Sequence, residues 1–342
     1  MKFLPYALRR VAFFVPQVLG VLVVTFVLVR LIPGDPARLM AGPLMPEAGV
    51  ELIREKMGLT GSLPVQFIHY AQRVFQGDLG SSWYTGNPVI TDIAMRLPVT
   101  VEILVLALLV TFFILLPLGI KAVSIGASLT KRVAGRGFFL YGMAAAAFPD
   151  FWLALILIFI FYAVLGWAPA PGGILDIGMA RPTQITGMYL VDSLLTGNWA
   201  TFISSLKHYI LPVFTLAFVY GGGIVKIAMV NATRVQRAEF INFARVSGLS
   251  LSTIQGYVTR LVYPPVVTYT AVCFAFLIGG VVLIETVFSL GGFGQYAVQA
   301  ITMTDYAAIQ GVVLISALIN LAVFVMVDMM YFWLDPRIRT LA

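Results

Sequence analysis

Charge is scarce in this sequence, and so are the residues that build metal sites and disulfides. Only 11% of its 342 residues are charged, 60% are hydrophobic, and it holds one cysteine and two histidines. A single cysteine, Cys273, excludes an intrachain disulfide, and the isolated His69 and His208 argue against a metal site. Several apolar runs of about 20 residues exclude a soluble globular fold. These features indicate an integral membrane protein.

The chain also lacks the motifs of an enzyme that acts alone on a nucleotide. It contains no Gly-x-x-x-x-Gly-Lys-Ser/Thr phosphate loop, and Gly221-Gly222-Gly223 lacks the strand and spacing of a nucleotide-binding loop, so helix packing explains it better. It shows no Ser/His/Asp or Cys/His constellation, which argues against an intramembrane enzyme. If this protein works with ATP, a separate polypeptide must hydrolyse it.

Six apolar segments are long enough to span a membrane, which predicts an all-α integral membrane fold. They are residues 11–32, 99–120, 138–164, 209–230, 266–288 and 308–334. Arg9-Arg10 precede the first segment as in a secretion signal. We nevertheless expect an uncleaved span, because the apolar run is long and no small-residue cleavage site follows it.

The basic residues predict the topology of these spans. Of the 22 lysines and arginines, 14 lie in the two terminal stretches and around the second and fourth interhelical loops, and residues 121–137 carry no acid. The positive-inside rule therefore places both termini and the loop 234–265 in the cytoplasm. This clustering also explains the net charge of +7 without nucleic-acid binding.

Two longer regions are then expected on the outer side. Residues 33–97 predict short helices over 46–57 ending at Gly58, over 64–76 ending at Gly77, and over 88–96 before Pro98. Residues 166–207 begin as an irregular loop and carry a weak helical pattern over 188–195. Both regions are suited to covering the spans or to receiving a delivery protein.

The polar loop 234–265 predicts a helix, a turn and a second short helix. Apolar and small residues recur there at helical spacing, Gly248 suits a left-handed stop, Ser250 suits a cap, and Pro264-Pro265 is expected to end the second helix. An amphipathic hairpin of this kind suits a groove on a soluble partner. A helix lying in the lipid headgroups is the open alternative.

Few ionisable residues lie at membrane depth. Asp150 follows Pro149 inside the third span, where it either faces a water-filled path through a broken helix or caps the amides freed by the kink. Glu102, Glu285 and Asp328 lie near predicted span ends, so interfacial solvation is the expectation for them.

Several motifs, in order along the chain, together resemble a known family. They are Tyr6-Ala7-Leu8-Arg9-Arg10, Arg30 to Ala37, Gly77 to Ser82, Arg96 to Glu102, Pro117-Leu118-Gly119, Phe148 to Trp152, Glu239 to Leu249 with Pro265 to Thr268, Glu285 to Ser289, Asp305-Tyr306 and Asp335 to Arg339. The chain resembles, over nearly its whole length, the B-type permease subunit of ATP-binding-cassette importers for dipeptides and oligopeptides.

The resemblance implies an architecture and a set of partners. It implies a type I importer transmembrane domain with six helices, divided as 1–32 (tail and first span), 33–97 (helical extracytoplasmic insertion), 98–334 (transmembrane core with the coupling hairpin 234–265) and 335–342 (tail). The implied partners are a second, related permease, two cytoplasmic ATPases that carry ATP and Mg²⁺, and an extracytoplasmic solute-binding protein. No cofactor is expected in this chain itself, and a bacterial inner membrane is its implied location.

The resemblance also suggests functional residues. We expect the ATPases to contact a coupling set, namely Arg237, Glu239, Phe240, Ala244, Arg245 and Gly248. We expect the translocation path or its gate to include Asp150, Glu285, Phe288 and Gly292. The family usually has serine at the position of Asp150 and a Trp-Pro pair at Gly291-Gly292, which indicates a diverged solute. The alternative, a secondary transporter or channel acting alone, predicts more embedded charges and an inverted repeat.

Overall fold

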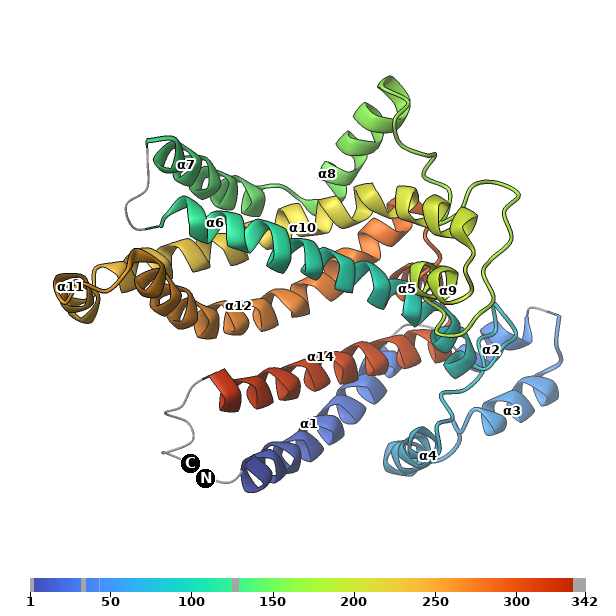
Figure 1. Ribbon diagram of the computed structural model, residues 1–342. Coiled ribbons are helices and arrows are strands. Elements are labelled where there is room, and N and C mark those ends of the chain that lie inside the picture. Colours follow the sequence, from blue (N-terminus) through green and yellow to red (C-terminus); the bar gives the residue numbers. More distant parts are fainter. Residues whose placement is uncertain (1–2, 32–34, 43, 125–128, 335–342) are drawn as a thin grey trace.

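The computed structural model describes residues 3–31, 35–42, 44–124 and 129–334, and they form helices joined by loops (Figure 1). The α-helices are α1 (Phe3–Leu31), α2 (Pro36–Ala41), α3 (Glu47–Lys56), α4 (Leu63–Phe75), α5 (Val89–Val110), α6 (Leu116–Ala122), α7 (Leu129–Ala144), α8 (Asp150–Leu157), α9 (Tyr189–Leu195), α10 (Trp199–Gln236), α11 (Glu239–Val246), α12 (Leu251–Phe288), α13 (Phe293–Thr302) and α14 (Tyr306–Leu334). A 3₁₀ turn (Ala145–Ala147) follows α7, and π-helical turns (Thr111–Leu115, Ile158–Val164) follow α5 and α8.

Most of the predicted spans correspond to long apolar helices. Four straight helices of the described residues are long and apolar enough to cross a membrane, and the pair Val133–Ala147 and Asp150–Val164, bent by 106°, adds a fifth if it counts as one span. The first predicted span contains a shorter apolar helix, Ala12–Leu28. The straight spans are Val89–Ala122, Trp199–Gln236, Leu251–Phe288 and Tyr306–Met330. Within the described ranges, four or five spans therefore meet the criteria of length and composition, and the count of six stays a prediction.

Helices α10 and α12 lie side by side at the centre of the bundle (Figure 1). Their buried side chains join those of α5 in one apolar cluster and those of α6 and α11 in another. Glycine allows α7 to approach α10 closely, because a Cβ on Gly142 of α7 would lie 2.8 Å from the Cβ of Lys226 and 2.9 Å from the carbonyl oxygen of Gly222. Burial of these two apolar clusters stabilises the packing of α10 and α12 against their neighbours.

Two predicted helix ends at proline are wrong. Helix α5 continues through Pro98 to Val110, and α12 continues through Pro264-Pro265 to Phe288. In α12 the reason is a stripe of four fully buried residues four positions apart, Ile254, Val258, Val262 and Val266, which packs on both sides of the prolines. This packing offsets the backbone hydrogen bonds that proline cannot donate. The expected break at Pro149 is confirmed, and Phe148 before it is extended.

The insertion after the first span folds largely as predicted. Helices α3 and α4 end at Lys56 and Phe75, and Gly58 and Gly77, both with positive φ, follow two residues after these ends. Helix α9 matches the weak pattern over 188–195. Helix α10 begins at Trp199, ten residues before the predicted span, because the Asn198 side chain accepts a hydrogen bond from the Thr201 amide at 3.2 Å and caps it. The residues from 199 to 208 therefore extend the helix beyond the apolar run.

The ends of the bundle differ in character. Figure 1 shows the start of α1, the end of α14 and α11 towards one end of the molecule, and α2, α3 and α9 towards the other. Helices α1 and α14 pack against each other along their lengths. The polar hairpin and the insertion therefore lie at opposite ends of the apolar helices.

Candidate functional site

The loop 234–265 forms the predicted helix and left-handed turn. Helix α11 ends in a Schellman motif, in which Gly248, at φ +78°, donates its amide to the Arg245 carbonyl and Leu249 donates to the Ala244 carbonyl at 3.1 Å. The Ser250 hydroxyl accepts a hydrogen bond from the Thr253 amide at 3.2 Å and caps α12. The hairpin is thus stabilised by local hydrogen bonds at its turn and is continuous with the two central helices.

The two faces of α11 have different roles. Ile241 and Ala244 are buried against Ile254 and Val258 of α12. The prediction that Ala244 offers an apolar surface to a partner is therefore corrected, because the three-residue spacing of Ile241 and Ala244 directs both side chains inward. Sequence reasoning missed Ile241, although that spacing was available as a signal.

The outer face of the hairpin is apolar and basic. Phe243 is 74% exposed and Val246 is 88% exposed, and Phe240, from the predicted coupling set, is also exposed. Arg237 and Arg245 line a groove of about 1290 Å³ that runs to α6 and α7 and also includes Arg136 and Arg234. Glu239 is exposed in the first turn of α11, where a carboxylate stabilises the helix dipole.

Asp150 lies at the break between the 3₁₀ turn after α7 and α8, and it links this break to α10. Its Oδ1 accepts a hydrogen bond from the Phe151 amide at 2.8 Å, and its Oδ2 accepts one from the Tyr220 hydroxyl at 3.0 Å. A Cβ on Gly280 of α12 would overlap both the carboxylate and the hydroxyl. Both interpretations of Asp150 remain open at this point, since the carboxylate caps the helix and is also half-buried rather than enclosed.

Glu285 is fully buried, and its predicted interfacial solvation is wrong. Its carboxylate accepts hydrogen bonds from the Thr100 hydroxyl of α5 and, at 2.9 Å, from the Gln295 amide at the start of α13. The Thr100 hydroxyl oxygen accepts a further bond from the Phe293 amide at 2.8 Å. The carboxylate thus connects α5, α12 and α13. Its burial is tolerated because these donors replace the hydrogen bonds that water would otherwise provide.

Gly292 lies directly against this carboxylate. A Cβ on Gly292 would overlap the Glu285 side chain, so only glycine fits there, and Phe288, the last residue of α12, is buried in the core. The structure thus brings Glu285 and Gly292 together, places Phe288 in the apolar core at the end of α12, and places Asp150 apart, at the α7–α8 break. Their role in a path or gate stays a prediction.

Glu102 is also buried, which corrects the second interfacial expectation. Its carboxylate accepts backbone hydrogen bonds from Tyr189 and Leu190 at 2.8 Å and from Val191 at 3.3 Å, and one from the Tyr209 hydroxyl at 2.9 Å. These amides are the free donors at the start of α9. A carboxylate from α5 therefore caps a helix that lies almost 90 positions later in the chain. Asp328 of α14 is half-buried.

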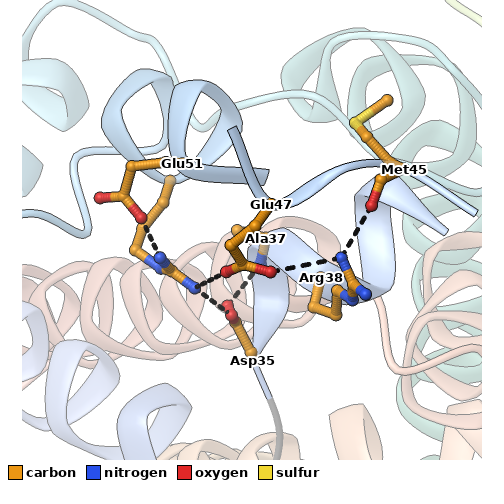
Figure 2. Close-up of polar contacts among 7 residues, drawn as sticks. Asp35, Ala37, Arg38, Met45, Glu47 and Glu51 are labelled. Atoms are coloured by element: carbon orange, nitrogen blue, oxygen red, sulfur yellow. Dashed lines mark hydrogen bonds and ion pairs between the residues drawn. The ribbon is translucent and has the colours of Figure 1, made fainter. Parts of the chain in front are cut away.

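An ion-pair network joins α2 to α3 in the insertion (Figure 2). Asp35 accepts a hydrogen bond from the Ala37 amide at 3.0 Å and pairs with Arg54, which also pairs with Glu51. Arg38 lies 3.5 Å from Glu47. Slight burial of Asp35 would raise its pKa, but the hydrogen bond and charge of Arg54 outweigh it and hold that pKa below its ordinary value.

This network borders a cavity of about 730 Å³ at the junction of the insertion with α1 and α14. Its wall includes Arg30, whose guanidinium donates to the Gln66 side chain at 2.9 Å and lies over the Phe26 ring. Within the described ranges no group of three or more His, Cys, Asp or Glu side chains is arranged to hold a metal ion.

Comparison with known proteins identifies the family of this chain. The family described as "Binding-protein-dependent transport system inner membrane component" matches residues 119–340, and the corresponding N-terminal family matches residues 2–107. The chain is 39% identical over 328 residues to the "Probable D,D-dipeptide transport system permease protein DdpB" of Escherichia coli K12, covering 94% of this chain and 93% of that protein.

Two dipeptide permeases are similar over almost the whole chain. The "Dipeptide transport system permease protein DppB" of Escherichia coli K12 is 31% identical, and that of Alkalihalophilus pseudofirmus is 30% identical; each alignment covers 98% of this chain and 99% of the relative. The helical membrane architecture agrees with these matches. This chain therefore belongs to the family of inner-membrane permease components of binding-protein-dependent ABC transport systems.

Proposed function

We propose that this permease subunit forms half of the translocation path for a peptide or peptide-like solute and works by alternating access. The names of the relatives support the solute class, since those described above are dipeptide or D,D-dipeptide permeases. The other half of the path comes from a second permease, which we expect to be a related chain. A solute-binding protein delivers the solute to the outer side.

The hairpin of α11 is the proposed contact with the ATPases, and it is the observation that carries this proposal. Phe240, Phe243 and Val246 are exposed beside Arg237 and Arg245, so an apolar centre with a basic rim is available to a soluble partner. Since α11 joins α10 directly to α12, a rigid-body movement of α11 would be transmitted to both central helices. The ATPases would drive transport only if they bind one orientation of the permease better than another.

The proposed orientation has both termini and α11 in the cytoplasm. The lysines and arginines of the interhelical loops support it, and so does the location of α11 at the same end as the start of α1 and the end of α14 (Figure 1). The insertion of α2, α3 and α4 then faces outward, where a delivery protein would meet it. ATP and Mg²⁺ are expected on the partner ATPases.

A reconstitution experiment tests this function. The permease pair would be placed in proteoliposomes with or without the ATPases, and uptake of labelled dipeptide would be measured with the binding protein present. We expect uptake only with ATPases and ATP. Uptake without ATPases would instead support a secondary transporter or channel.

A substitution in the turn gives a sharper test of the hairpin. Gly248→Val strains a position with φ +78°, at a cost of about 1 kcal/mol or more, and should uncouple ATP hydrolysis from uptake. Gly256→Val in α12 is the matched control, because a Cβ there meets open space and the backbone is helical. Unchanged uptake per ATP hydrolysed in the Gly248 variant would contradict the coupling role.

A further inference from the structure

Among the described residues, the carboxylate of Asp150 has hydrogen-bond donors but no cationic side chain to balance its charge. Its donors are the Phe151 amide and the Tyr220 hydroxyl, both neutral. No ion pair joins it to a lysine, arginine or histidine in the described ranges. The start of α8 and the hydroxyl stabilise the negative charge without neutralising it. An uncompensated charge at membrane depth is costly, so it points to a cation that another molecule supplies.

The chemistry of Asp150 is suited to an organic cation. A carboxylate binds an ammonium group through a charge-assisted hydrogen bond. The exposed rings of Phe148 and Trp152 stack with centroids 5.6 Å apart and an interplanar angle of 16°. Trp152 follows Asp150 by two residues in α8, and residues two apart on a helix do not face each other, so this aromatic pair lies outside the contact that we assign. A single carboxylate favours a protonated amine over a hard metal ion, which would need several oxygen ligands.

The carboxylate is also held in one position before any ligand arrives. Tyr220 of α10 fixes Oδ2, and the backbone of α12 at Gly280 lies against both groups, since a Cβ there would overlap them. The Tyr220 hydroxyl lies 3.2 Å from the Phe276 carbonyl of α12 as well. Three helices therefore preorganise Asp150, and preorganisation lowers the entropic cost of binding.

We propose that Asp150 binds the protonated amino group of the solute as it crosses the membrane. The inference rests on the proposed importer function and specifies its substrate class, namely solutes with a free primary ammonium such as the amino terminus of a peptide. The second permease would supply the facing wall of the path. The hydrogen bond from Phe151 is then the cap that keeps the carboxylate at the break.

Charged thiol reagents test the electrostatics of this position. Phe151→Cys, in a Cys273→Ser background, would be labelled with cationic MTSET or anionic MTSES in the intact permease complex in nanodiscs. We expect the ratio of the MTSET labelling rate to the MTSES labelling rate to exceed the ratio for a free thiol in solution by about fivefold or more. Asp150→Asn should abolish this preference for the cationic reagent. Tyr220→Phe is the matched control, because it removes the hydrogen bond and keeps the charge. An unchanged preference in Asp150→Asn, or no labelling by either reagent, would overturn the proposal.

Protection by peptides tests the ligand class. Millimolar Ala-Ala should slow the labelling of Phe151→Cys, N-acetyl-Ala-Ala should not, and Asp150→Asn should remove the difference. Equal protection by both peptides, or none by Ala-Ala, would leave Asp150 as a helix cap only and end the proposal. Dipeptide uptake is measured separately. Protection without uptake would contradict the importer function, whereas uptake without protection would contradict this inference alone.

Discussion

The carboxylate of Glu102 on α5 lies 2.9 Å from the hydroxyl of Tyr209 on α10, and both side chains are buried. The same carboxylate caps α9, so one side chain connects two spanning helices to the loop region between residues 166 and 198. Buried polar groups of this kind are costly when one partner is lost. The pair is therefore a stabilising link rather than a solvated charge.

Substitutions in this pair should lower stability to different extents. Tyr209→Phe removes one donor and is expected to cost about 1 kcal/mol. Glu102→Gln should cost more, because an amide group would face the backbone N–H groups of α9 with a donor in place of an acceptor. Thermal unfolding of the purified protein in detergent measures both. Tyr189→Phe is the control, since Tyr189 bonds Glu102 through its backbone amide; equal losses in all three variants would contradict the explanation.

Gly292→Ala should be destabilising because of a steric conflict. The added Cβ would overlap the buried Glu285 carboxylate and disturb its bonds to Thr100 and Gln295. Overpacking of this kind typically costs about 1–3 kcal/mol. Gly279→Ala, in a helix with open space around the new Cβ, should be neutral or slightly stabilising in the same unfolding assay. If the two variants melt alike, the steric conflict is absent.

Substitutions on the buried face of α11 should lower the stability of the protein, and substitutions on its exposed face should reduce coupling to the ATPases. Ile241→Ala creates a cavity in the core and should cost about 2–5 kcal/mol of stability. Phe243→Ala changes an exposed side chain, so it should leave the melting temperature unchanged and reduce solute-stimulated ATP hydrolysis by the assembled complex. Unfolding and ATPase measurements on both variants check this. Full coupling in Phe243→Ala would place the ATPase contact elsewhere.

Asp78 should contribute stability that depends on pH. A 2.8 Å hydrogen bond from Arg73, with help from the Gly80 amide, holds the pKa of Asp78 below its ordinary value of 3.8 against the opposing effect of partial burial. Because the folded-state pKa is depressed, the contribution is complete above the ordinary value and is lost as the pH falls through the lower one.

The measurement for Asp78 is a comparison across pH. Asp78→Asn should melt below the wild type at about pH 7, and the difference should shrink as the pH falls below the ordinary pKa of 3.8 and vanish once the pH is below the depressed pKa of the folded state. Asp176→Asn is the control, because this exposed carboxylate accepts no hydrogen bond from the described residues. A difference between Asp78→Asn and the wild type that persisted in acid would indicate lost packing instead of lost charge.

Local patterns in the sequence were sufficient for the membrane class and for the helical hairpin. An apolar run of membrane length predicts a spanning helix, and the glycine at position 248 predicts a left-handed turn. Both predictions depend only on residues within one segment of the chain and not on the segments that pack against it. The same holds for the break before Asp150, because proline restricts the residue before it. Family resemblance added the importer class, which neither composition nor spacing establishes.

Only the tertiary structure decided what happens where distant segments meet. Helix α12 passes Pro264-Pro265 because its buried stripe packs on both sides of them, and Ala244 points inward because α12 lies beneath it. Glu102 and Glu285 are buried because amides from α9 and α13, remote in the sequence, replace water as their partners. These outcomes depend on long-range packing and on hydrogen bonds between helices, and no local pattern carries that information.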